Sequence, residues 1–107
     1  MVISLDKLKI AFQGMNGAYS NLACEECYPN AMTIPCSSFE NMLENTKNGV
    51  SDLSMVPVEN SVAGRVADIH NLIPESGLYI IAEHYQKVNH QLLSYLLLYF
   101  FSYEVVV

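Results

Sequence analysis

The sequence predicts an α/β fold, a mostly parallel sheet with flanking helices, on the basis of three observations. Short apolar runs at residues 7–13, 31–35, 53–58 and 78–82 are separated by segments of helical period. Strands that alternate with helices of about ten residues indicate parallel βαβ units. Apolar residues make up 51% of the 107 residues, which is enough to form the core of one small domain.

The charge balance narrows the classes of partner. The formal net charge is −6, from eleven acidic and five basic residues, and Lys and Arg form no run. We therefore expect neither nucleic acid nor an anionic membrane surface as a partner, although local donors could bind an anionic small molecule. The N-terminus shows no signal-peptide pattern, so a cytoplasmic protein is expected.

Three cysteines suggest reduced thiols and no disulfide framework. Cys24 and Cys27 form a C-x-x-C motif. A zinc site is not expected there, because Cys36 is the only other cysteine and no His is nearby to complete the set of ligands. We expect no metal and no cofactor. The motif is interpreted as small buried side chains on a helix face, with a redox pair as the alternative.

The first predicted strand, residues 7–13, leads into a loop with two glycines, Gly14 and Gly17. Glycine permits positive φ there, and a helix with Tyr19 on its apolar stripe is expected to follow. This resembles a phosphate-binding loop only loosely, because it has neither the Walker spacing nor a complete G-x-G-x-x-G. Tyr19 has a core position as its alternative interpretation.

The second strand, residues 31–35, precedes the most clearly marked helix. Ser37 and Glu40 fit an S-x-x-E capping box, and apolar residues follow at helical spacing. Lys47 near the end and Gly49 just beyond it predict where this helix stops.

The third strand, residues 53–58, ends at a polar triplet, Glu59, Asn60 and Ser61. Ligands bind outside the carboxyl ends of the strands in open α/β sheets, so this is a candidate site. Pro57 suggests an edge position or the last turn of the strand. A helical stripe over residues 62–73 then predicts a helix that Pro74 and Gly77 end, with Ser61 as its N-cap.

The fourth strand begins at residues 78–82 and is expected to continue to residue 90. Residues 92–107 then hold one charge, Glu104, and neither Gly nor Pro. This run is shorter than the ~20 residues of a membrane span. We expect a strand or helix buried against another copy of the chain, hence a homo-oligomer, or else the aberrant ending of a truncated reading frame. The expected organisation is a lobe over residues 1–93 and an atypical apolar tail over 94–107.

With these pieces placed, residues 8–93 resemble the N-terminal part of the prephenate dehydratase family. Several ordered blocks carry the resemblance: Ile10-Ala11-Phe12-Gln13-Gly14 with Gly17-Ala18-Tyr19-Ser20, Pro35-Cys36 with Phe39, Val56-Pro57-Val58-Glu59-Asn60-Ser61 with Gly64 and Val66, and Asn89-His90 with Leu92-Leu93. The resemblance implies one lobe of a two-lobe catalytic region like that of type II periplasmic binding proteins. It also implies a lyase of phenylalanine biosynthesis, which converts prephenate to phenylpyruvate with loss of water and carbon dioxide.

Carried over by position, the resemblance implies that these residues bind the substrate in a cleft: Ala18, Tyr19, Ser20, Glu59, Asn60, Ser61, Asn89 and His90. Backbone donors would face the carboxylates of prephenate. Three of these residues also have a structural interpretation: Glu59 holding a loop, Ser61 capping a helix, and His90 as an ordinary polar residue. Arg65 is either a charged donor or a solvated helix residue.

The departures from the family bear on activity. The family's Thr-Arg-Phe motif has no counterpart, since Thr33 and Thr46 are the only threonines and neither precedes Arg-Phe. The catalytic group is therefore unknown, and the chain is expected to be inactive without a second lobe. Two hypotheses remain: a lobe of a prephenate or arogenate dehydratase, and a non-catalytic, ligand-binding or self-associating member of the same ancestry.

Overall fold

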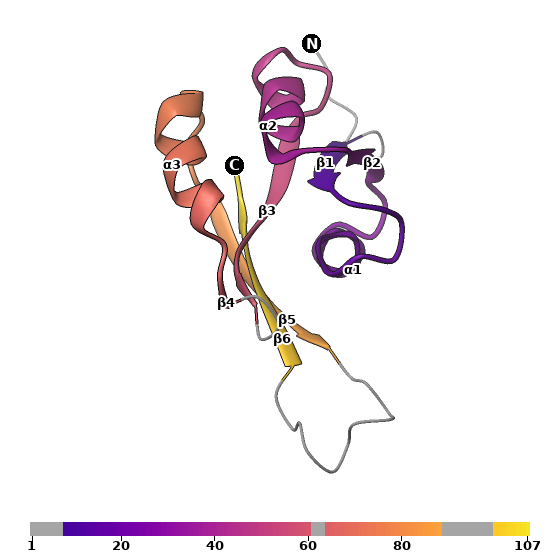
Figure 1. Cartoon of the computed structure of the whole chain (residues 1–107). Coiled ribbons are helices and arrows are strands. Elements are labelled where there is room, and N and C mark those ends of the chain that lie inside the picture. The colour runs from indigo at the N-terminus through magenta and orange to yellow at the C-terminus, as the bar shows by residue number, and fades with distance from the viewer. Residues whose placement is uncertain (1–7, 61–63, 89–99) are drawn as a thin grey trace.

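The computed structural model describes residues 8–60, 64–88 and 100–107. The elements follow one another as β1 (Lys9–Gln13), α1 (Tyr19–Cys27), β2 (Met32–Cys36), α2 (Phe39–Lys47), β3 (Leu53–Asn60), β4 (Gly64–Arg65), α3 (Ala67–Ser76), β5 (Ala82–Val88) and β6 (Phe100–Val106) (Figure 1). Strands alternate with helices through most of the chain, which confirms the predicted α/β class.

The described strands form one mixed sheet in the order β2-β1-β3-β6-β5, with β4 paired to β3 beside this path. β1 is parallel to both β2 and β3. β6 is antiparallel to both of its neighbours, β3 and β5. The parallel part thus agrees with the βαβ pattern, whereas the antiparallel strand comes from the segment that we did not assign to the sheet.

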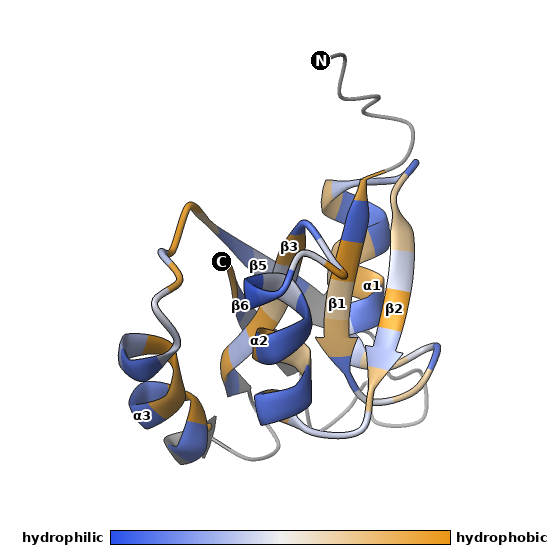
Figure 2. Cartoon of the chain, turned by 90° about the horizontal axis from the view of Figure 1, so that it is seen from above, coloured by the Kyte–Doolittle hydropathy of each residue, from blue (hydrophilic) through white to orange (hydrophobic). Residues whose placement is uncertain are grey.

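The helices cover opposite faces of the sheet, and the alternation of β1 shows which face is which. Ile10 and Phe12 pack with Ala23 and Cys24 of α1. Ala11, on the other face, belongs to a cluster that includes residues of α2 and α3: Met42, Leu43 and Ile69. Seen from above, α1 and α2 lie on opposite sides of the largely hydrophobic β1 (Figure 2).

α2 begins one residue later than the predicted capping box. Ser38, not Ser37, is the N-cap, and its side chain accepts a hydrogen bond from the Asn41 backbone N–H at 3.1 Å. This places Asn41 at the third helical position, so Glu40 does not close a box with Ser37. The C-terminal signals are confirmed, since Lys47 is the last helical residue and Gly49 follows with φ of +80°.

α3 differs from its predicted helix at both ends. It begins at Ala67 with Val66 as N-cap, so Ser61, which lies outside the described residues, does not cap it. Pro74 lies inside the helix, which continues to Ser76 and ends at Gly77 with φ of +76°. A proline this close to the C-terminus removes only one of the last helical hydrogen bonds, and Gly77 supplies the stop.

Pro57 occupies a central strand and not the predicted edge or strand end. β3 lies between β1 and β6, and its pairing with β6 shifts register between Pro57 and Glu59. Proline cannot donate to a ladder, and a bulge is one of the few places in a sheet that accept it. β3 extends past the predicted end to Asn60.

The apolar end of the chain contributes β6 to the chain's own sheet. Val105, Val106 and Val107 are each at most 5% exposed, and Glu104 is fully buried. For these residues the burial that we expected against another copy is supplied within the chain. The expected boundary between residues 93 and 94 lies outside the described residues. Among the described helices, none is long and apolar enough to cross a membrane.

We predict that Val106→Ala destabilises the fold by about 1–3 kcal/mol, because it opens a cavity between the sheet and α1. Val106 is 1% exposed, and the matched control is Val50→Ala at a side chain that is 53% exposed. The control is expected to change the free energy of unfolding by less than about 0.5 kcal/mol. Urea unfolding followed by circular dichroism measures both, and equal effects would contradict the assigned position of β6.

Candidate functional site

The predicted site residues that the structure describes, from Ala18 to Ser20 and at Glu59 and Asn60, lie at the same end of the sheet. β1 and β3 are parallel neighbours, so their carboxyl ends point the same way. The chain leaves β1 through a loop that enters α1 at Tyr19, while Glu59 and Asn60 close β3. We call residues 17–21, at the start of α1, the α1 corner.

The loop before α1 is held by its own hydrogen bonds. Gly14 has φ of +123° and donates its N–H to the Cys36 carbonyl at 2.9 Å. Gly17 has φ of +91° and donates its N–H to Asn21 Oδ1 at 2.8 Å. Ala18 donates to the Met15 carbonyl at 3.0 Å. The Ala18 amide, predicted to face a substrate carboxylate, is therefore already used inside the loop.

Ser20 joins the α1 corner to β6. Its side chain is 5% exposed, and its hydroxyl donates to Glu104 Oε1 at 2.5 Å. The two residues are 84 positions apart in sequence. Ser20 was predicted to line the cleft, and the structure gives its hydroxyl proton a partner within the protein. Tyr19, beside it, is half-buried.

Glu104 was not a candidate from sequence, although it is the only charge in the apolar run. In the sheet it lies opposite Pro57 of β3 and His84 of β5. The His84 ring Nε2 lies 2.9 Å from Gln86 Oε1 and 3.9 Å from Glu26 Oε2 of α1. A buried carboxylate needs hydrogen-bonding partners, and the Ser20 hydroxyl of α1 is one of them.

Asn21 is a second residue that the sequence did not single out. It is 4% exposed, and its Oδ1 accepts from Gly17 while its Nδ2 is buried without a hydrogen-bond partner. A buried unpaired amide donor costs free energy, and an acceptor oxygen within reach would satisfy it. The α1 corner thus offers a side-chain donor beside the positive end of a helix.

The end of β3 is built differently from the prediction. Glu59 is exposed and lies opposite Arg65 of β4 and Tyr103 of β6. Arg65 is therefore on a strand and not on a helix. Asn60 lies opposite Gly64 and Ser102. Because the next helix begins at Ala67, the triplet does not supply helix N-terminal amides as predicted.

Ser61, Asn89 and His90 lie outside the described residues, so their part in the site stays a prediction. The described residues do link the two segments. Ser20 binds Glu104, which lies opposite Pro57, two positions before Glu59 along β3. The α1 corner and the end of β3 therefore belong to the same end of the sheet.

The threonines lie elsewhere in the fold. The Thr46 hydroxyl bonds the Ser51 and Ser54 hydroxyls, at 2.8 and 2.5 Å, between α2 and β3. Thr33 is on β2. Within the described ranges, no group of three or more metal-ligating side chains comes together.

Cys24 is fully buried in the core, as the interpretation of C-x-x-C as small buried side chains predicts. Burial, and secondly the nearby Glu104, raise the pKa of the Cys24 thiol to about 12. Burial also raises the pKa of Cys27. A thiol that stays protonated is a poor nucleophile and a poor metal ligand, so the redox alternative is not supported.

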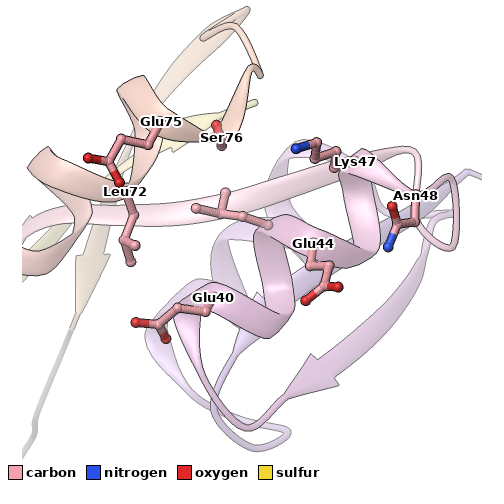
Figure 3. A pocket seen from close by; sticks show the side chains of 8 residues that line it. Glu40, Glu44, Lys47, Asn48, Leu72, Glu75 and Ser76 are labelled. Atoms are coloured by element: carbon pink, nitrogen blue, oxygen red, sulfur yellow. The ribbon is translucent and has the colours of Figure 1, made fainter.

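A groove of about 350 Å³ lies between α2 and α3. Figure 3 shows Glu40, Glu44 and Lys47 on α2 and Glu75 on α3. Three carboxylates against one ammonium make this groove unfavourable for an anionic ligand.

A second cavity, of about 360 Å³, lies between α3 and the strands β3, β5 and β6. Most of its lining is apolar. His70 is half-buried there, and its Nε2 is buried without a hydrogen-bond partner. The Tyr103 hydroxyl donates to Glu83, and this bond raises the pKa of Tyr103. This cavity is on the sheet face opposite α1.

Comparison with known proteins identifies relatives over most of the chain. A family model described as prephenate dehydratase matches residues 10–97. A bifunctional N-acyl-homoserine lactone acylase/prephenate dehydratase of Komagataeibacter europaeus is 51% identical over 84 residues, which are 78% of this chain and 30% of the relative. Arogenate dehydratase/prephenate dehydratase 1 of Arabidopsis thaliana is 38% identical over 87 residues, which are 81% of this chain and 22% of the relative. The chain spans less than a third of the length of these relatives.

Solved structures agree. The quorum-quenching acylase GqqA has a TM-score of 0.75 and 41% identity, over 92% of this chain and 45% of that protein. Prephenate dehydratase of Streptococcus mutans has a TM-score of 0.74 over 94% of this chain and 49% of its own, at 19% identity, and so supports the fold alone. The Arthrobacter aurescens prephenate dehydratase, solved in complex with L-Phe, has a TM-score of 0.68 and 31% identity over 76% of this chain and 28% of that protein.

We predict that Ser20→Ala lowers the free energy of unfolding by about 1–3 kcal/mol, because it removes a donor from the buried Glu104. The matched control is Ser37→Ala at an exposed position, expected to cost less than about 0.5 kcal/mol. Urea unfolding measures both. If the Ser20→Ala loss is the same in a Glu104→Leu background, which has no acceptor at this position, the hydrogen bond does not couple α1 to β6.

We also predict that Cys24 resists alkylation by iodoacetamide at pH 8. With a pKa of about 12, only about one Cys24 thiol in ten thousand is ionised at that pH. Mass spectrometry of the native chain should find Cys24 unlabelled, while the urea-unfolded chain reacts at all three cysteines. Native labelling as fast as labelling of the unfolded chain would refute the burial of this thiol.

Proposed function

Because the chain belongs to the prephenate dehydratase family, we propose that it forms one lobe of a prephenate-binding site and serves the lyase reaction that yields phenylpyruvate, water and carbon dioxide. The observation that carries the proposal is the α1 corner, where a buried unpaired amide donor lies at a helix N-terminus beside the carboxyl end of β1. The proposed substrate-contacting residues are Ala18, Tyr19, Ser20, Glu59, Asn60, Ser61, Asn89 and His90, together with Asn21.

Prephenate carries two carboxylates, and the net charge of −6 opposes its approach. Binding must therefore come from local donors. The N-terminus of α1 carries partial positive charge, and the Asn21 amide can donate to a carboxylate oxygen. Glu104 is fully buried and bonded to Ser20, so its charge is held behind the helix and not presented to the ligand.

The reaction breaks two bonds that join substituents to the ring of prephenate. The ring hydroxyl leaves with a proton as water, the carboxylate on the opposite ring carbon leaves as carbon dioxide, and the electron pair of the broken C–C bond completes the aromatic ring. The hydroxyl therefore needs a proton donor. The Ser20 proton is committed to Glu104, and Thr46 lies between α2 and β3.

We propose that the proton donor belongs to a second lobe, in the part of the longer relatives that this chain does not span. The absence of a Thr-Arg-Phe motif from the sequence supports this division of roles. The chain alone then supplies carboxylate binding, and turnover requires the complementary lobe. Glu59 is exposed at the end of β3. We propose that it holds the end of the strand and does not donate the proton to the leaving hydroxyl.

Two alternatives follow from specific observations. Burial of β6 within the sheet supports a stable module that binds ligands or self-associates without catalysis. The acylase named in the Komagataeibacter europaeus relative supports hydrolysis of N-acyl-homoserine lactones as a second activity. The α1 corner gives this second activity little support, because the Ser20 hydroxyl faces Glu104 and the His84 ring faces Gln86.

We predict that the purified chain yields no phenylpyruvate from prephenate above the acid-catalysed background, and that adding the complementary remainder of the Komagataeibacter europaeus relative produces turnover. Arogenate and an N-acyl-homoserine lactone are assayed in parallel to separate the substrate classes. Turnover by the chain alone contradicts the division of roles. Silence with every substrate after complementation favours the non-catalytic alternative.

Binding is tested separately by calorimetry with prephenate. Asn21→Asp replaces the amide donor by a carboxylate and should weaken binding at least about tenfold, because like charges repel. The matched control, Asn41→Asp on the exposed side of α2, should bind as the unaltered chain does. Equal affinities of the two variants would exclude the α1 corner as the carboxylate site.

A further inference from the structure

We propose that the outer edge of β5 is a self-association surface, at which β5 pairs antiparallel with β5 of a second copy of the chain. β5 is the last strand of the sheet path, and in the part of the chain that the structure describes no strand pairs with its outer edge. Figure 1 shows β5 and β6 running together as a long arm away from α2 and α3. An unpaired edge presents backbone donors and acceptors to any complementary strand.

The apolar surface of the described residues is concentrated beside this edge. Tyr79 is 83% exposed, Ile80 56% and Ile81 62%, in consecutive positions leading into β5. Tyr85, within the strand, is 61% exposed. Contiguous exposed apolar side chains of this kind mark interaction sites more often than isolated ones do.

The opposite edge of the sheet is protected and this one is not. β2 carries Pro35, which cannot donate a hydrogen bond to a further strand. β5 contains no proline. Val107 exchanges both backbone hydrogen bonds with Ser54 of β3, so alternation turns the backbone groups of Val106 and Glu104 toward β5. Ala82 and His84 lie opposite these two residues and point inward, so the backbone groups of Glu83 and Tyr85 point outward.

The sequence of β5 is complementary to itself in charge. A two-fold axis through Tyr85 places Glu83 of each copy opposite Lys87 of the other, and Ala82 opposite Val88. His84 then lies opposite Gln86, and the two Tyr85 rings meet at the axis. Opposite charges facing each other across an antiparallel pair stabilise it, whereas like charges destabilise it.

This symmetry argues for a second copy as the occupant and against an unrelated peptide. The strand carries one acidic and one basic residue, Glu83 and Lys87, at equal distances from Tyr85. In a chain with a net charge of −6, a pairing that neutralises both carboxylates of the dimer edge avoids the repulsion that other contacts between copies would meet. The inference does not depend on the proposed enzymatic function.

Sedimentation velocity over a range of micromolar concentrations tests the proposal. The unaltered chain should show a concentration-dependent dimer. Glu83→Lys and Lys87→Glu each create like-charge pairs across the axis and should weaken dimerisation at least about tenfold. Glu40→Lys on exposed α2 makes the same charge change as the first variant and should leave the dimer unchanged.

Mixing the two variants gives the decisive measurement. An equimolar mixture of Glu83→Lys and Lys87→Glu chains restores both opposite-charge pairs and should restore a dimer that neither forms alone. Since Glu83 also accepts a hydrogen bond from Tyr103, thermal unfolding of each variant is checked first, and the Lys87→Glu chain tests the register without changing that acceptor. A monomeric unaltered chain, or variants that dimerise as well as it does, overturns the proposal.

Discussion

The buried pair of Ser20 and Glu104 determines how the rest of the structure fits together. A carboxylate with no exposed surface is stable only where donors reach it, and the first turn of α1 supplies one at 2.5 Å. The pair fixes the face on which α1 lies and the register at which β6 enters the sheet. It also brings the start of α1 to the level of Pro57, near the end of β3.

The two faces of the sheet have different roles because of this arrangement. The α1 face combines a dry cluster around Phe12 and Met55 with the polar groups around Glu104. The other face is mainly apolar and packs on α2 and α3. The proposed ligand site lies where the polar part of the α1 face meets solvent. Its geometry is set by hydrogen bonds that also hold the fold together, such as the one between Ser20 and Glu104.

Local signals predicted the first part of the fold well. The glycine loop, the C-terminal end of α2 and the parallel strands β1 to β3 follow from side-chain period and turn chemistry, which depend on near neighbours. β6 could not be predicted in this way, because an apolar run is equally compatible with a strand, a helix or an interface between copies until the segment that it packs against is known. The positions of Pro57 and Pro74 were predicted wrongly for the same reason. Pro57 is accommodated by a bulge in a central strand, and Pro74 lies in the last turns of a helix that ends at Gly77. Asn21 and Glu104 gain their significance only from partners elsewhere in the chain.

The position of β6 has a consequence for how the protein is made. β6 follows every other described strand in sequence, yet it lies between β3 and β5. During synthesis on the ribosome, β3 must therefore wait with one side unsatisfied, and β5 has no neighbour in the sheet, until β6 emerges. Until then the nascent chain exposes unpaired strand edges, which are prone to aggregation. We therefore expect the yield of folded protein in the cell to depend on chaperones and on the speed of translation.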